Sequence, residues 1–215
     1  PNYFKIKDEP VFSIYDLKLF IESFDGIEGS QSALEYFRDE VKKAGFPGLH
    51  VQMIGKYDIV NPTNPVLFNS NFMEEIQIEE FISLLGINSV TMYNMAPKGD
   101  IQDYLVYGER GIALRDNWDS ILDVPFFPVV SAGWDNTPRY LDMGKESVIH
   151  LHSTPQSFAT YLHKAKEYVD NQHDQPPLII INAWNEWVEG SYLEPDMLHG
   201  YGYLEAVRDV MNGKY

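Results

Sequence analysis

Residues 178–190 read LIIINAWNEWVEG and join the most apolar run of the chain to its densest group of acidic and aromatic residues. The run from Leu178 to Ala183 is short, continuous and rich in Ile, which is typical of a strand buried on both faces of a sheet. Two Trp, two Glu and an Asn follow it directly. Side chains just beyond the carboxyl end of a parallel strand lie at the edge of the sheet where ligands bind. This stretch therefore predicts both the fold class and the position of a site.

The same alternation of a short apolar run with a longer helical segment occurs five times along the chain. The apolar runs have the length of strands, and the segments between them have the length or the apolar spacing of helices. We expect strands at 10–15, 48–54, 89–93, 126–131 and 178–183, and helices at about 30–44, 74–85, 100–121, 154–169 and 202–211. Strands that alternate with helices predict an α/β domain with a parallel sheet of right-handed βαβ units.

Two architectures fit this alternation: an open, doubly wound sheet and part of a (β/α)8 TIM-type barrel. The open sheet usually carries a Gly-rich phosphate loop after its first strand, whereas this chain has Asp16-Leu17-Lys18-Leu19 there. The barrel explains why polar and aromatic residues follow several strands, since the strand ends of a barrel converge on one mouth. We therefore expect residues 1–215 to form a single domain with about the last five βα units of a barrel. About three N-terminal units would lie outside it, and pairing with them or self-association would cover the exposed strand edges.

The charge of the chain limits its partners. Its 16 Lys and Arg stand against 32 Asp and Glu, which gives a formal net charge of −16. An acidic protein repels phosphate backbones and anionic membrane surfaces, so nucleic acid and membranes are not expected partners. No apolar run approaches the ~20 residues of a membrane-spanning helix. The chain has no Cys, which excludes disulfides and thiolate chemistry. Neutral ligands remain, and sugars are the prominent neutral class.

Glu186 and Glu189 are the candidate catalytic residues. Cleavage of a glycosidic bond uses one protonated carboxyl group, which donates to the leaving oxygen, and one ionised carboxylate, which acts as base or nucleophile. Aromatic neighbours lower the local dielectric constant, which favours the protonated form of one group, and they offer flat faces for a sugar. The alternative is a solvated turn with two ordinary Glu residues. The strand before the motif and its aromatic density favour catalysis.

The candidate substrate-binding residues lie beyond the strand ends or beside the two carboxylates. They are Tyr15, Asp16, Tyr93, Asn94, Trp134, Asp135, Arg139, Trp184, Asn185, Trp187 and Tyr192. Asp135 has an alternative role as a turn cap that pairs with Arg139, and Tyr15 an alternative role in core packing. His150 and His152 alternate as on a strand, which suggests a pair of metal ligands. No third ligand lies at a spacing typical of a metal site, so we expect neither a metal nor a cofactor.

Several segments carry a resemblance to a known family. Residues 185–196, NEWVEGSYLEPD, and 200–206, GYGYLEA, resemble the C-terminal signature of WbsX-type proteins. These are glycoside hydrolase family 99-like domains of bacteria, often named for lipopolysaccharide biosynthesis. Residues 10–15 and 133–139 resemble the pattern of the same family in the same order. The resemblance spans nearly the whole chain and implies a (β/α)8 barrel of which this chain is the C-terminal part.

The resemblance also implies a mechanism. Family 99 endo-α-mannosidases carry a similar Asn-Glu-Trp-x-Glu-Gly motif and are understood as retaining enzymes, in which the 2-hydroxyl of the sugar is the nucleophile through a 1,2-anhydro intermediate. At the matching positions, Glu186 would be the base that assists the 2-hydroxyl and Glu189 the acid/base at the leaving oxygen. Val188 stands where those mannosidases usually have His. The expected substrate is therefore a polysaccharide or glycan, with α-mannosides as one candidate.

Two other classes of function stay open. A non-catalytic carbohydrate-binding domain would keep the cleft without turnover. A glycosyltransferase of surface polysaccharide (lipopolysaccharide) biosynthesis is suggested by the usual name of the family. Nucleotide-sugar transferases commonly hold a metal-bound diphosphate with an Asp-x-Asp pair, which this chain does not contain, so hydrolysis ranks first. The start at Pro1 has no signal-peptide pattern, and the sequence does not choose between the bacterial cytoplasm and the periplasm or secretion.

Overall fold

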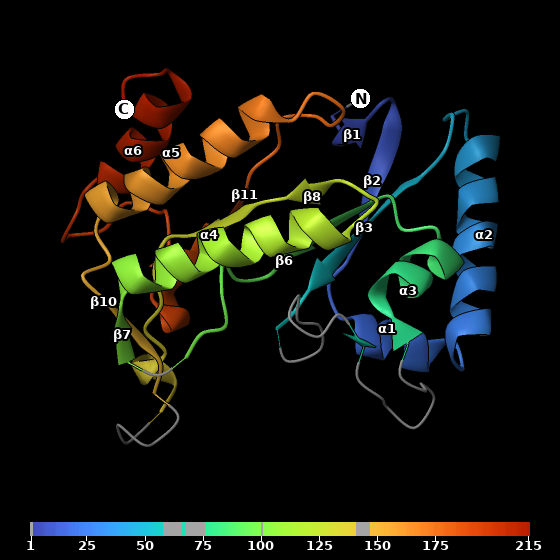
Figure 1. The fold of residues 1–215 in the computed structure, drawn as a ribbon, viewed down its shortest axis with the longest axis horizontal. Coiled ribbons are helices and arrows are strands. Elements are labelled where there is room, and N and C mark those ends of the chain that lie inside the picture. The colour runs from blue at the N-terminus through green and yellow to red at the C-terminus, as the bar shows by residue number, and fades with distance from the viewer. Residues whose placement is uncertain (1, 58–65, 68–75, 100, 141–146) are drawn as a thin grey trace. The chain divides into compact units, whose positions relative to one another are not determined.

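A computed structural model describes residues 2–57, 66–67, 76–99, 101–140 and 147–215 (Figure 1). The chain divides into two compact units. The first comprises Pro1–Met92 and Asn117–Phe126, and the second comprises Tyr93–Asp116 and Phe127–Tyr215.

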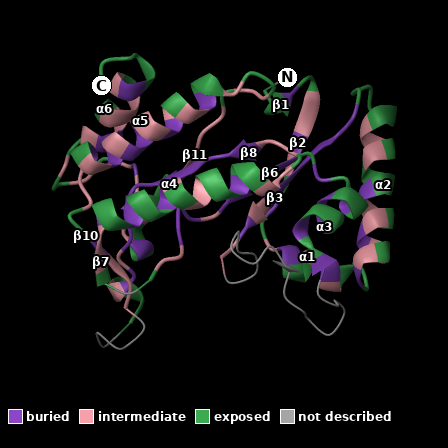
Figure 2. Ribbon diagram, in the orientation of Figure 1, coloured by how far each residue is buried: buried purple, intermediate pink, exposed green. Residues whose placement is uncertain are grey.

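The first unit is built on a sheet with the strand order β1-β2-β3-β6-β8. The short β1 is antiparallel to β2, whereas β2, β3 and β6 are parallel, with Val11 opposite His50 and Gln52 opposite Ser89. Because β3 and β6 have a neighbouring strand on each side, nearly all of their residues are buried (Figure 2). The bounds are β1 Lys5–Ile6, β2 Glu9–Ile14, β3 His50–Gly55, β6 Ser89–Met92 and β8 Phe126–Phe127.

Three helices of the first unit lie next to one another (Figure 1). They are α1 (Leu17–Ser23), α2 (Ile27–Lys43) and α3 (Ile78–Leu85), and a two-stranded ladder of β4 (Val66–Leu67) and β5 (Ile76–Gln77) precedes α3. α3 ends at Gly86, whose φ of 61° is the left-handed conformation that glycine adopts without strain. Arg38 of α2 donates to the backbone carbonyls of Leu85 and Gly86 at 2.8 and 2.6 Å. These two hydrogen bonds connect α2 to the end of α3.

The second unit combines two parallel strand pairs with long helices. β9 pairs with β11, and β7 pairs with β10. Thr154 and Ser157 form a capping box at the start of α5, and α5 packs against α6 (Figure 1). α4 begins in this unit, and its residues from Asn117 onward belong to the first unit. The bounds are β7 Ile101–Asp103, α4 Tyr104–Ile121, β9 Val129–Ser131, β10 Ile149–Leu151, α5 Pro155–Asn171, β11 Ile180–Asn182 and α6 Gly202–Met211.

Buried tyrosines form the core between α4 and α5. The rings of Tyr104 and Tyr161 meet edge to face with centroids 5.8 Å apart, and the hydroxyl of Tyr104 donates to the backbone carbonyl of Ser131. Tyr161 lies directly on Gly108, where an added Cβ would be only 2.1 Å from its ring. Only glycine at position 108 allows this close approach of ring to helix.

The predicted alternation of strands and helices is confirmed, and several bounds differ. The strand expected at 126–131 is split into β8 and β9 by Pro128, which has no backbone N–H to donate. The helix expected from residue 100 begins at Tyr104, because the residues before it form β7. The helix expected at 74–85 begins at Ile78; residues 74 and 75 lie outside the described residues. α1 and the short β1, β4, β5 and β7 were not predicted.

The prediction that the last strand is buried on both faces of the sheet is wrong. Leu178, Ile179, Ile180 and Ile181 are all only half-buried. β11 pairs with β9 on one side, and it has no partner on its other side among the described residues. Among the same residues, no helix is both long and apolar enough to cross a bilayer.

His150 is a buried titratable residue in the second unit. Its ring lies 3.9 Å from that of Tyr107, and its Nε2 donates to the carbonyl of Lys98 at 3.1 Å. Burial, which removes water from the ring, lowers the pKa of His150 to about 4, and the positive charges of Arg110 and Lys98 add to the effect. The histidine is therefore neutral in the folded protein near neutral pH.

We predict that His150 makes the protein acid-sensitive. In the unfolded chain its pKa returns to about 6.5, so between pH 6.5 and 4 the unfolded state binds the extra proton. The free energy of unfolding should therefore fall as the pH drops through this window, by at most about 3 kcal/mol from this residue. Urea unfolding of the wild type and His150→Gln at pH 7 and pH 5 measures the effect. An equal loss in both proteins would contradict the assignment.

Candidate active site

The predicted catalytic segment folds back on itself directly after β11. Asn185 and Glu186 form β12 (Asn185–Glu186), which is antiparallel to β13 (Ser191–Tyr192), and the single turn η2 (Trp187–Glu189) connects them. Gly190 ends this turn with a φ of 57°, a conformation that favours glycine. The Ser191 hydroxyl lies 3.0 Å from the backbone oxygen and 2.9 Å from the side-chain oxygen of Asn182, both of which can accept from it. These bonds fix the two carboxylates relative to the end of the strand.

Glu189 is a buried carboxylate with partners on both oxygens. Its side chain is only 6% accessible. Nη1 of Arg139 lies 2.9 Å from Oε1, and the hydroxyl of Tyr93 donates to Oε2 at 3.4 Å. Ionised groups are costly to bury without a compensating charge. Arg139 therefore neutralises Glu189 and fixes its orientation.

Glu186 shares the same arginine but lies in a different environment. Nη2 of Arg139 is 4.0 Å from Oε2 of Glu186, whose side chain is 41% accessible. One guanidinium thus joins a buried and a partly exposed carboxylate. Two carboxyl groups in unequal surroundings are the usual basis for dividing acid and base roles between them.

Arg139 reaches the carboxylates because the two strands before these segments are paired. β9 and β11 run parallel with Ser131 opposite Asn182, so both chains leave the sheet at the same end. The backbone N–H of Asp135 donates to the carbonyl of Glu189 at 2.6 Å, which joins the two segments beyond the strands. This is the convergence of strand ends that the parallel sheet predicts.

Asp135 has the turn-capping role that was the alternative to sugar binding. Its Oδ1 accepts from the backbone N–H of Thr137 at 3.0 Å and from the Thr137 hydroxyl at 2.7 Å, at the start of the turn η1 (Thr137–Arg139). The other half of that alternative, a pair with Arg139, is wrong, because Arg139 contacts the two glutamates instead. A contact of Asp135 with substrate stays a prediction.

A lysine that the sequence did not single out lies beside the predicted residues. Nζ of Lys98 is 3.8 Å from the ring centroid of buried Trp134 and 5.9 Å from that of Tyr93. Among the described residues, Nε1 of Trp134 and Oδ1 of buried Asn94 have no hydrogen-bond partner. Buried polar atoms of this kind are those that a bound water or ligand can satisfy.

Exposed aromatic rings flank the two carboxylates. Trp184 is 53% and Trp187 44% accessible, and Asn185 is exposed as well. The rings of Trp187 and Tyr192 are stacked with centroids 3.8 Å apart. Large rings that remain open to solvent beside a carboxylate pair can act as stacking platforms for a ligand.

Tyr15 and Asp16 lie in the first unit, and their place beside the carboxylates stays a prediction. Asp16 caps α1 by accepting a hydrogen bond from the backbone N–H of Leu19. This bond, together with nearby Lys56, lowers the pKa of the Asp16 carboxyl group. Nζ of Lys56 is 4.2 Å from the ring centroid of Tyr15. Since Tyr15 is 50% accessible, its alternative role in the core is wrong.

The structure separates the two histidines that were weighed as a metal pair. His150 is buried against Tyr107, whereas exposed His152 forms a 2.7 Å pair with Asp103. Within the parts of the chain that the structure describes, no cluster of three or more His, Asp or Glu side chains could hold a metal ion.

The ion pair predicts how the stability responds to loss of Arg139. Arg139→Gln leaves the buried Glu189 without its compensating charge and should lower the free energy of unfolding by about 1–3 kcal/mol. Adding Glu189→Gln should restore part of this loss, because the uncompensated charge is then absent. Urea unfolding measures all the variants.

Arg208→Gln is the matched control for this prediction, because Arg208 forms an exposed pair with Asp209. Exposed pairs of this kind contribute roughly 0–1 kcal/mol. If Arg139→Gln and Arg208→Gln were equally stable, the ion pair would not be what holds Glu189.

A family profile and curated relatives match nearly the whole chain. The profile of a family described as "Glycosyltransferase WbsX" matches residues 1–207. The uncharacterized protein WxcX, from two strains of Xanthomonas campestris pv. campestris, is 27% identical over 216 residues, which cover 98% of this chain and 28% of the relative. The chain thus spans just over a quarter of the length of these relatives.

A solved structure shows the same fold. It is called "Glycoside hydrolase-like protein" and superimposes with a TM-score of 0.62 over 97% of this chain and 56% of its own chain. At 12% identity this match concerns the fold alone. The family match, in contrast, extends over nearly all of the sequence and includes the segment with both carboxylates. The chain belongs to the WbsX family.

Proposed function

We propose that this chain is the C-terminal portion of a carbohydrate-active enzyme that cleaves a glycosidic bond of a polysaccharide or glycan with Glu186 and Glu189. The observation that carries the proposal is the pair of unequal carboxylates on one arginine. Exposed tryptophans beside them suit a sugar ring. The likeness to a glycoside hydrolase-like fold is consistent with the proposal.

The family resemblance supplies the roles of the two residues. Glu186 takes the proton of the 2-hydroxyl as this oxygen attacks the anomeric carbon, and Glu189 gives its proton to the leaving oxygen as the glycosidic bond breaks. Water then opens the 1,2-anhydro intermediate: Glu189 accepts a proton from the water, and Glu186 returns one to the 2-oxygen. The anomeric configuration is thereby retained, and both carboxyl groups return to their starting states.

Arg139 and Tyr93 act as positioning residues in this scheme. Arg139 neutralises an ionised Glu189 in the sugar-free protein, so the proton-donating role requires this ion pair to loosen and Glu189 to take up a proton from water when a sugar enters. Glu186 needs less rearrangement, because it is more exposed and its contact with Arg139 is longer. Candidate contacts with the sugar are Tyr15, Asp16, Tyr93, Asn94, Trp134, Asp135, Trp184, Asn185, Trp187 and Tyr192.

The proposed architecture is the last five βα units of a (β/α)8 barrel. The parallel order β2-β3-β6 and the parallel pair β9-β11 are consistent with barrel strands. The match covers little more than half of the structural relative, as expected if further units complete the barrel. Such units would pair with the edge of β11 that has no partner among the described residues. Without them, this edge could pair with a second copy of the chain.

Glycosyl transfer is the second candidate, and the description of the family favours it. With the same carboxylates, an acceptor hydroxyl could open the 1,2-anhydro intermediate in place of water. A hydrolase releases a reducing sugar in water alone, whereas a transferase needs an acceptor or an activated donor.

We predict that the carboxylates are required for turnover and not for binding. In the full-length protein, Glu186→Gln and Glu189→Gln should each reduce turnover by about 10²–10⁴-fold, because each removes a proton transfer. Glycan affinity should change little, because these transfers act in the transition state. Oligosaccharide release from α-mannans and bacterial surface polysaccharides measures turnover.

Glu205→Gln, at an exposed position of α6, is the matched control and should retain full activity. Glycan binding without turnover in the wild-type protein would instead indicate a binding domain. Unchanged rates in both active-site variants would remove the pair from the mechanism.

A further inference from the structure

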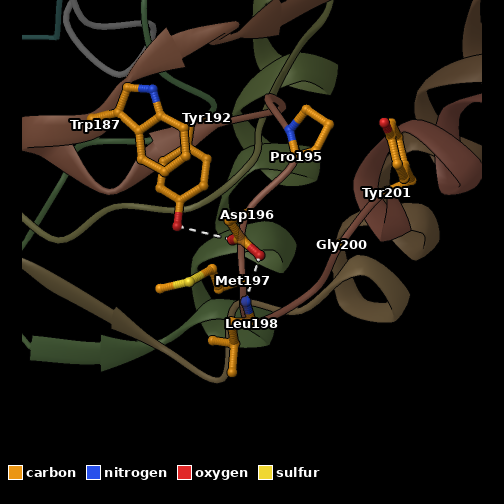
Figure 3. Close-up of a pocket in the computed structure, with 8 residues that line it drawn as sticks. All are labelled: Trp187, Tyr192, Pro195, Asp196, Met197, Leu198, Gly200 and Tyr201. Atoms are coloured by element: carbon orange, nitrogen blue, oxygen red, sulfur yellow. Dashed lines mark hydrogen bonds between the residues drawn. The ribbon is translucent and has the colours of Figure 1, made fainter.

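A pocket of about 670 Å³ lies beside the carboxylate segment, over the loop that leads to α6 (Figure 3). Trp187 and Tyr192 line it on one side of this loop and Tyr201 on the other, with Met197 and Leu198 between them (Figure 3). None of the roles proposed above requires Met197, Leu198 or Tyr201.

The loop at this pocket is held in one conformation by its own hydrogen bonds. Asp196 Oδ1 accepts from the backbone N–H groups of Leu198 and His199, and Oδ2 accepts from the hydroxyl of Tyr192 at 3.0 Å. Asp196 and Gly200 also exchange backbone hydrogen bonds of 3.0 and 3.3 Å. This turn presents the side chains of Met197 and Leu198, 105% and 80% accessible, to solvent.

The aromatic wall of the pocket is ordered in the same way. The Trp187 indole N–H donates to Oε2 of Glu194 at 2.6 Å, and its ring is stacked on Tyr192. Tyr201, on the opposite side of the loop, is 68% accessible. Rings fixed before a ligand arrives lose little conformational entropy on binding. Apolar side chains that remain exposed on a loop with a fixed conformation are typical of a binding surface.

We infer that this pocket is a second sugar subsite, which holds another unit of the glycan whose bond lies at Glu186 and Glu189. The inference rests on the proposed function. It identifies the substrate class as a neutral oligosaccharide or polysaccharide chain rather than a single terminal sugar. Trp187 lies between the two carboxylates in the sequence and also lines the pocket, so one glycan chain can occupy both places.

The chemistry of the lining selects this occupant. A pyranose ring presents apolar C–H faces to aromatic rings and hydroxyl donors at its edge. The carboxylate in the lining is Asp196, and three of its about four acceptor positions are occupied by Tyr192, Leu198 and His199, so about one remains for a hydroxyl. Anionic phospholipid headgroups and nucleic acids would be repelled by the carboxylate of Asp196 and by the formal net charge of −16. A neutral, hydroxyl-rich ligand satisfies both parts of the lining.

The test is the dependence of affinity on glycan length in the full-length protein. The probes are an array of bacterial surface glycans and α-mannan oligomers graded from monosaccharide to hexasaccharide. We expect the wild type to bind long oligomers more tightly than short ones. Tyr201→Ala should lower affinity for the longest oligomers by about twofold to tenfold, the range of one aromatic contact, and remove the gain with length. Leu198→Ser, at the exposed tip, should act in the same direction without affecting folding.

Tyr36→Ala is the matched control, since Tyr36 on α2 is also 68% accessible. If affinity rises with oligomer length only when Tyr201 is present, and no probe is cleaved, the result would support the subsite and contradict the proposed hydrolysis. Turnover with the same length dependence in Tyr201→Ala as in the wild type would support hydrolysis and overturn the subsite. Absence of binding to every probe would contradict both. Self-association that Leu198→Ser abolishes, with glycan binding unchanged, would show a protein interface and overturn the inference.

Discussion

The ion pair between Arg139 and Glu189 is the interaction on which the candidate site depends. A carboxylate that is only 6% accessible requires a compensating charge, and Arg139 provides it from a segment fifty positions earlier in the chain. The two segments meet because β9 and β11 pair in parallel and leave the sheet at the same end. Asp135 then joins them by a backbone hydrogen bond to Glu189, and Gly190 allows the close approach of Asp135. Sheet pairing, turn geometry and charge compensation thus converge on one carboxylate.

Local patterns were enough to predict the longer helices, the main parallel strands and the place of the segment that holds both glutamates. The apolar run before Trp184 predicts a strand, and polar residues just beyond a parallel strand predict a site. α6 begins at Gly202 and ends at Met211 as expected, because its amphipathic spacing is unbroken. Both glutamates lie beyond β11, as their position in the sequence implies.

The remaining features depend on contacts between distant residues, which a single sequence does not reveal. Arg139 was weighed as a partner of Asp135, four positions away, because local pairing was the simplest arrangement; the three-dimensional partner is Glu189. Lys98 was not singled out, because its contact with Trp134 joins two separate loops. The burial of residues 178–183 was overestimated for a related reason. An apolar run predicts a strand, but it does not predict how many other strands pair with it.

In the proposed mechanism, Glu186 and Glu189 surround the bond that is cleaved. The most direct measurement is a crystal structure of the full-length Glu189→Gln protein with a bound oligosaccharide. We expect a glycosidic oxygen within hydrogen-bond distance of residue 189 and the adjacent 2-hydroxyl within reach of Glu186, with the next sugar directed toward Trp187. A glycan bound elsewhere, with Glu186 and Glu189 still paired with Arg139 and free of sugar, would contradict the proposed mechanism.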